Sequence, residues 1–195
     1  MCSDPSCNHG WSAYSTSKPT WRPRPRRKPV RESVADRDAA YRWEAQCLGD
    51  LENGLRLGPV TVTSVQDAAA VIQAVTTYVA DLWQRHAGQY RALHQSVPTV
   101  DIRFHWHQQR GGGKALMRSH LISIDHRCCG KTWICHELAH LLTPYAGHSQ
   151  PWRDAVAAIW SREYWCSRGY ATAEAERLGL DLGRAVTAMV EFAQP

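Results

Sequence analysis

The residues best able to do chemistry lie in the segment Cys135–Leu142, which contains the pattern His-Glu-x-x-His. On an α-helix, residues four apart lie one turn apart on the same face, so His136 and His140 direct two imidazoles at one point. Glu137 lies about 100° round the helix, at the flank of that face. The pattern predicts a hydrolytic zinc site in which Glu137 is the general base acting on a metal-activated water.

The other residues of this segment fit an amphipathic helix. Its opposite arc is apolar and is formed by Ile134, Leu138, Leu141 and Leu142. We expect Thr132 to cap the start of the helix and Pro144 to follow its end. The alternative is a core helix whose two histidines are structural.

A catalytic zinc usually has three protein ligands, and His148 is the candidate for the third. It follows the segment Thr143–Gly147, whose Pro and Gly allow the chain to turn back. Ser149 can then cap a second helix. The carboxylates of Asp154 and Glu163, on that second helix, are the rival third ligands.

The segment after the second histidine offers one more functional group. Tyr145, close to His148, could donate a hydrogen bond to an oxyanion, or it could be a packed loop tyrosine.

These residues resemble the SprT-like and related zincin metallopeptidases, in which a His-Glu-x-x-His helix is followed by a loop and a His-Gly-x-x-aromatic step. Here the second step is His148-Ser149-Gln150-Pro151-Trp152, with Ser in place of Gly. The chain also resembles a group of small metallohydrolase-like proteins of bacteria and their phages, which share the opening seen here at Arg37–Glu44. The resemblance covers roughly Arg31 to Gly183. It implies a zincin-like core, bound Zn²⁺ and a peptide or protein substrate that adds as a strand along Ser119–Asp125.

Several other patterns offer weaker chemistry. His105 and His107 have the spacing of a metal pair on a strand, and are a rival zinc site that lacks a positioned carboxylate. Cys128, Cys129 and Cys135 favour buried thiols over a thiolate site. The run Gly111–Gly113 is a turn without the lysine spacing of a phosphate-binding loop. The Cys-rich zinc ribbon of some SprT-like proteins is absent, so their DNA-repair role is not carried over.

The charge is divided unevenly along the chain. Lys18–Arg31 holds seven basic residues and no acid, whereas the whole chain carries +5, so the remainder carries −2. We interpret residues 1–30 as a Pro- and Arg-rich disordered tail, including Cys2, Cys7 and His9. The tail could be a solvated linker, or it could contact nucleic acid weakly with Trp21 stacking on a base.

Three functional classes remain open. The first is the zinc metallopeptidase. The second is a nucleic-acid-associated protein that uses the basic tail and has a structural or vestigial zinc site. The third is a non-catalytic interaction protein with a decayed zincin core, against which the retention of all four site residues argues.

The remaining residues, 31–195, predict one α+β domain. We expect strands at Pro59–Thr63, Thr99–His107 and Ser119–Asp125 in a small twisted sheet packed on helices, including the His-Glu-x-x-His helix. A first helix is expected over Arg31–Glu52. A long helix, Val65–His86, starts with Ser64 as cap and is expected to pack across the sheet. Its apolar face is predicted from Val65, Ala69, Ile72, Val79 and Leu82, and His86 is interpreted as a surface histidine.

The last helical region is expected to be capped by Thr172. Neither a membrane-length apolar run nor a signal-peptide core occurs, so we expect a cytoplasmic protein, and the seven cysteines do not form a disulfide pattern.

Overall fold

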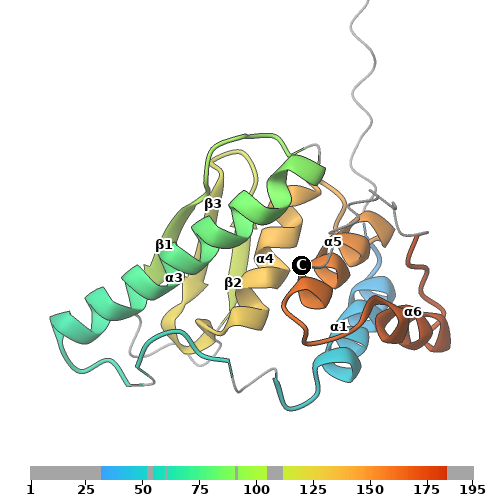
Figure 1. Cartoon of the computed structure of the whole chain (residues 1–195), viewed down its shortest axis with the longest axis horizontal. Coiled ribbons are helices and arrows are strands. Elements are labelled where there is room, and N and C mark those ends of the chain that lie inside the picture. Colours follow the sequence, from blue (N-terminus) through green and yellow to red (C-terminus); the bar gives the residue numbers. More distant parts are fainter. Residues whose placement is uncertain (1–31, 52–54, 60, 91, 105–111, 184–195) are drawn as a thin grey trace, which may run out of the picture.

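The computed structural model describes residues 32–51, 55–59, 61–90, 92–104 and 112–183. The elements in chain order are α1 (Val34–Leu48), α3 (Val65–His86), η1 (Ala87–Gln89), β1 (Thr99–Arg103), β2 (Gly113–Leu116), β3 (Leu121–Asp125), η2 (His126–Cys128), α4 (Lys131–Leu142), α5 (Gln150–Arg162) and α6 (Arg168–Arg177). This arrangement confirms an α+β architecture (Figure 1). The predicted basic tail and the pair His105 and His107 lie outside the described residues.

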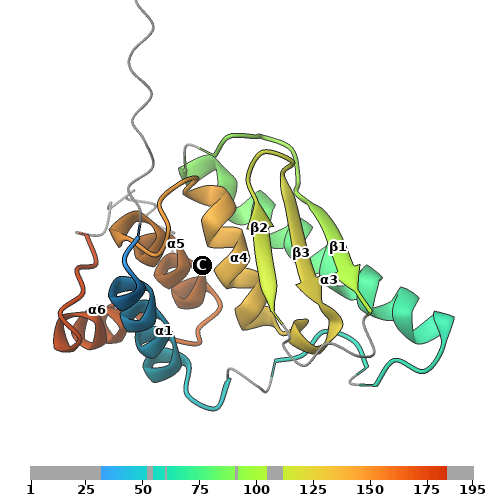
Figure 2. The same cartoon turned by 180° about the vertical axis from the view of Figure 1, so that it is seen from behind.

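The sheet has the strand order β1-β3-β2, in which β1 is parallel and β2 antiparallel to β3. The register pairs Val100 with Ile122 and Ile102 with Ile124, so apolar side chains share one face. Helices α3 and α4 cover that face, and the opposite face of the sheet is turned to the viewer in Figure 2.

Helix α4 lies between the sheet and a second layer made of α1, α5 and α6 (Figures 1 and 2). The second layer is joined by tryptophans that are fully buried. Trp43 of α1 donates from Nε1 to the carbonyl of Ala171 in α6 at 2.9 Å, and its ring lies 4.9 Å from that of Trp160 in α5. This anchoring fixes α1 against α5 and α6.

Helix α1 is shorter than the predicted range Arg31–Glu52. It begins after Ser33, whose side chain accepts from the N–H of Asp36, and ends at Gly49, which has a φ of 51°. A positive φ interrupts an α-helix and is readily adopted by glycine.

The strand predicted at Pro59–Thr63 is wrong for the residues of that range that are described. The segment just before it forms the backbone pairing instead: Leu57 N–H donates to Cys129 O, and Lys131 N–H donates to Leu55 O, both at 2.8 Å. Proline lacks an N–H to continue such a ladder.

Helix α3 has the predicted bounds and a capping box formed by Ser64 and Asp67, but its buried face differs from the predicted one. Of the predicted apolar face, Val79 and Leu82 are buried, whereas the residues in its first half, Val65, Ala69 and Ile72, are exposed. Val71 and Val75 are buried in their place. His86, interpreted as a surface histidine, is fully buried at the end of the helix.

The predicted strand at Ser119–Asp125 is shorter, and a separate strand precedes it. The hairpin of β2 and β3 turns at residues 117–120, where His120 has a φ of 50°.

Two predicted caps are also wrong, because the N-cap of α4 is Gly130 rather than Thr132 and that of α6 is Ser167 rather than Thr172.

None of the helices in the described ranges has the length and apolarity needed to cross a membrane.

Candidate metal centre

The fold brings the three predicted histidines together. His136 and His140 come from α4, and His148 comes from the end of the loop that leads into α5. One ligand atom of each lies within 4.8 Å of the others, so the three could hold a metal ion. The ring of Trp152, which is fully buried, contacts all three imidazoles at centroid distances of 4.6–5.3 Å.

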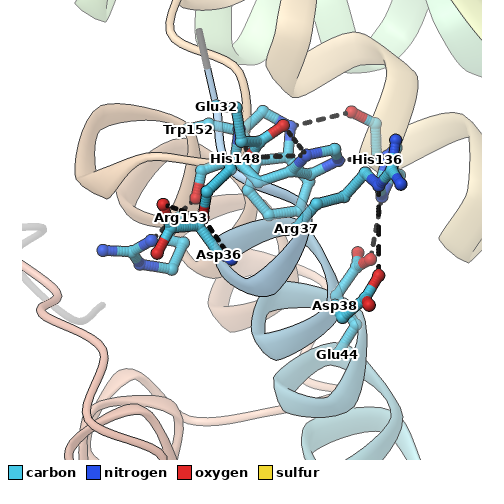
Figure 3. A network of polar contacts seen from close by, with 10 residues as sticks. Glu32, Asp36, Arg37, Asp38, Glu44, His136, His148, Trp152 and Arg153 are labelled. Carbon is cyan, nitrogen blue, oxygen red and sulfur yellow. Dashed lines mark hydrogen bonds and ion pairs between the residues drawn. The ribbon is translucent and has the colours of Figure 1, made fainter. Parts of the chain in front are cut away.

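Two carboxylates determine which ring nitrogens face the centre (Figure 3). Glu44 Oε2 lies 2.8 Å from Nδ1 of His136, and the carboxylate of Glu32 lies 3.0 Å from Nδ1 of His148. Because an ionised carboxylate only accepts hydrogen bonds, each Nδ1 carries a proton, and in a neutral ring Nε2 then presents its lone pair to the centre. Carboxylate–histidine pairs of this kind orient the imidazoles that bind metals.

The two Nε2 atoms face each other. Nε2 of His136 and Nε2 of His148 are 3.2 Å apart. Two neutral imidazoles in this orientation repel unless a proton or a metal ion lies between them. Two zinc–nitrogen bonds of about 2.0–2.1 Å at a tetrahedral angle place their nitrogens roughly 3.3 Å apart, so the spacing fits a shared metal ion.

His148 is held at the start of α5 by its backbone as well as its ring. Its N–H donates to Glu32 Oε1 at 2.7 Å, and its carbonyl accepts from Arg153 Nη1 at 2.7 Å (Figure 3). Gly147 has a φ of 58°, and a Cβ there would lie 3.3 Å from the Glu32 carboxyl carbon. The turn into α5 therefore favours glycine at this position. Ser149 occupies the predicted N-cap position, but its side chain makes no capping bond.

The histidine pKa values diverge inside the cluster. Burial lowers the pKa of His136, but the carboxylates of Glu44, Glu137 and Glu32 together outweigh burial and raise the pKa above the ordinary value. Burial and the neighbouring imidazoles hold the pKa of His140 well below the ordinary range, and burial also lowers that of His148. The rings of His140 and His148 are therefore neutral at pH 7, as metal ligation requires.

Glu137 is buried beside the cluster, on the side of β2. Burial raises the pKa of its carboxyl, whereas His136 and a hydrogen bond from the Ala115 N–H act in the opposite direction. A carboxylate with a raised pKa is suited to accept and return a proton near neutral pH.

The approach of α4 to β2 depends on small residues in the strand. A Cβ on Gly113 would lie 2.6 Å from Glu137 Oε1, closer than carbon and oxygen can approach without displacement. The sequence pattern predicted only a turn at Gly111–Gly113, but Gly113 is the first residue of β2.

The two rival carboxylates point to other partners. Asp154 binds Arg168 and Glu163 binds Arg85, each at 2.6 Å. Neither belongs to the histidine group, which leaves His148 as the third member.

The predicted Tyr145 is in the loop between α4 and α5. Its side chain is exposed, its φ is 65°, and its N–H donates to the sulfur of Met117. Its role as an oxyanion donor stays a prediction. Tyr41 of α1 lies over the cluster, with ring centroids 5.7 Å from His136 and 5.1 Å from His148.

The cysteines near the helix are thiols, with Cys129 and Cys135 buried and Cys128 half-buried. Cys135 lies on the apolar side of α4 beside the Tyr78 hydroxyl, and burial raises its pKa to about 12. Burial likewise raises the pKa of Cys129 to about 12. The absence of thiolate character at both positions fits the interpretation as buried thiols.

Sequence reasoning missed Glu32, Glu44 and Tyr41 as parts of the site. Tyr41 and Glu44 lie three residues apart in the opening Arg37–Glu44, so that opening carried a signal for them. Glu32 is 116 residues from His148 in the chain, and no local pattern connects the two.

Comparison with known proteins adds no identification, because no protein-family model, curated protein or solved structure matches the chain.

The two carboxylates should support metal affinity without being ligands. We expect Glu44→Gln and Glu32→Gln each to weaken zinc binding about 10–100-fold, because the amides cannot fix the tautomer or raise the basicity of His136 and His148. Competition with a fluorescent zinc chelator measures this. The control is Asp38→Asn, since Asp38 is an exposed carboxylate on α1 that pairs only at 4.0 Å with Arg37. Equal affinities for all four proteins would contradict the assignment.

Proposed function

We propose that this protein is a zinc-dependent metallopeptidase with a zincin-like core. The observation that supports the proposal best is the pair of Nε2 atoms facing each other at 3.2 Å, completed by His140 and flanked by the buried Glu137. Three imidazoles are a ligand set typical of catalytic zinc, which keeps a fourth position for water or substrate.

The residues have separate roles in this proposal. His136, His140 and His148 hold Zn²⁺, which when bound lowers the pKa of water and polarises a substrate carbonyl. Glu137 accepts the proton of the attacking water and later returns it to the leaving amine. The raised pKa of its carboxyl favours this exchange.

The strand that holds the substrate must differ from the predicted one. The range Ser119–Asp125 contains β3, which is central and pairs with β1 on one side and β2 on the other, so it has no free edge for a peptide. Strand β2 is the edge next to α4, and its Ala115 N–H reaches Glu137. We therefore assign the addition of an extended peptide to the outer edge of β2.

The alternative function, nucleic-acid association through Lys18–Arg31, concerns residues outside the described part of the chain and stays a prediction. No contact of the described site favours it over hydrolysis.

Replacing Glu137 by Gln should abolish hydrolysis and leave zinc bound. The amide keeps the size of the side chain but cannot accept the proton, so we expect cleavage to fall at least 10²–10⁴-fold. A proteome-derived peptide library, read by mass spectrometry, measures cleavage, and atomic absorption measures zinc. A wild type that cleaves no peptide, or a variant that cleaves as fast as wild type, would refute the proposed mechanism.

Gly113→Ala should displace the base without disturbing the metal. The added Cβ pushes the Glu137 carboxylate from its place, and a displacement near 1 Å can cost about 10²-fold in rate. The matched control is Gly112→Ala, because a Cβ at Gly112 meets nothing within 4 Å. We expect the control to keep full activity and both variants to keep zinc. Two variants of equal activity would show that Gly113 does not position Glu137.

The roles of Tyr41 and Tyr145 as oxyanion donors can be distinguished by removing each hydroxyl. Because the ring of Tyr41 overlies His136 and His148, we expect Tyr41→Phe to lower kcat about 10²-fold with little change in zinc affinity, as for loss of one oxyanion donor. Tyr145→Phe, at the exposed loop position, is expected to have a smaller effect. The opposite order would assign the donor to Tyr145.

A further inference from the structure

A cavity of about 250 Å³ adjoins the histidine cluster between α1 and α4. Its lining consists of Tyr41, Glu44, Leu48, Thr132, Trp133 and His136. An engineered cavity of about 150 Å³ is enough to bind benzene, so this cavity has room for an aromatic side chain.

The cavity and the metal centre share the ring of His136. Its Nδ1 side meets Glu44 in the cavity wall, and its Nε2 side meets His148 in the cluster. Tyr41 also belongs to both, since its ring lines the cavity and overlies two of the imidazoles. The cavity on the Nδ1 side is therefore separated from the metal centre on the Nε2 side by one imidazole ring, a distance that a side chain of a molecule held at the metal centre can reach across.

The lining indicates the chemistry of that side chain. Two aromatic rings, Tyr41 and Trp133, and the buried Leu48 supply apolar surface. Glu44, the one carboxylate among the described lining residues, is bound to His136 at 2.8 Å. A second anion would be repelled by Glu44, and a cation would compete for the carboxylate that orients His136. An uncharged aromatic or large aliphatic group avoids both costs.

We propose that this cavity is the specificity pocket for a large apolar or aromatic residue of the substrate, next to the bond that is cleaved. The inference rests on the proposed function, since it needs an open position on the bound metal.

Hydroxamates test the pocket without requiring a known substrate, because they bind an open zinc site through the hydroxamate group. Calorimetry with zinc-loaded protein would compare acetohydroxamate, N-hydroxy-3-phenylpropanamide and succinic monohydroxamate. We expect the phenyl compound to bind about 10–100-fold more tightly than acetohydroxamate, as burial of an aromatic group predicts, and the succinic compound to gain nothing.

Two variants test whether the gain in affinity from the phenyl group comes from the cavity. Trp133→Ala removes one wall of the cavity at a half-buried position and should reduce the gain from the phenyl arm severalfold, while acetohydroxamate binds as in wild type. Trp165→Ala, a half-buried tryptophan between α5 and α6 that does not line the cavity, should retain the gain.

The outcomes separate the two proposals. Binding of acetohydroxamate without any gain from the phenyl arm, or a gain that survives Trp133→Ala undiminished, overturns the pocket and leaves the metal site standing. A larger gain for the succinic compound than for the phenyl compound overturns the apolar specificity. No binding of any hydroxamate to the zinc-loaded wild type means that the metal has no open position, which overturns the proposed function and the pocket with it.

Discussion

Two imidazole nitrogens that face each other across 3.2 Å are the constraint on which the site depends. The carboxylates of Glu44 and Glu32 hold a proton on each Nδ1 and so commit each Nε2 to the interior. Such an arrangement is unfavourable for neutral rings alone and favourable around a cation. The fold maintains it at the cost of burying two histidines beside two half-buried carboxylates.

The elements around the cluster each contribute one part of this constraint. Helix α4 supplies His136, His140 and Glu137, the turn at Gly147 supplies His148, and α1 supplies the orienting Glu44. The Trp43–Ala171 hydrogen bond fixes α1 to α6. The second layer of the fold therefore positions the Glu44 carboxylate beside His136. The sheet contributes on the opposite flank, where β2 approaches Glu137 through glycine and alanine.

The central helix was predictable from sequence because its information is local. The spacing of His136 and His140 and the apolar arc opposite them follow from helical periodicity alone. The helix Val65–His86 was equally predictable, since its capping box with Ser64 and Asp67 is a sequence pattern. The buried face of that helix was not predictable, because tertiary packing selects among several apolar residues. The same holds for His86, whose burial no local pattern indicates.

The remainder of the site depends on contacts between distant segments. Glu32 approaches His148 only because α1 packs against α5 and α6, and the role of Gly113 appears only when β2 meets α4. The misplaced strand at Pro59–Thr63 and the expectation that Ser119–Asp125 forms a free edge of the sheet have a related origin. Strand order is set by pairing across the sheet, and the central position of β3 cannot be read from its own residues.

The most direct test of the central claim is X-ray absorption spectroscopy at the zinc edge on the purified, zinc-loaded protein. Three imidazole nitrogens at the usual zinc–nitrogen distance of about 2.0–2.1 Å and one light oxygen ligand are the predicted coordination shell. A shell with sulfur at about 2.3 Å, or a protein that retains no zinc at neutral pH, would contradict a three-histidine centre with an open position.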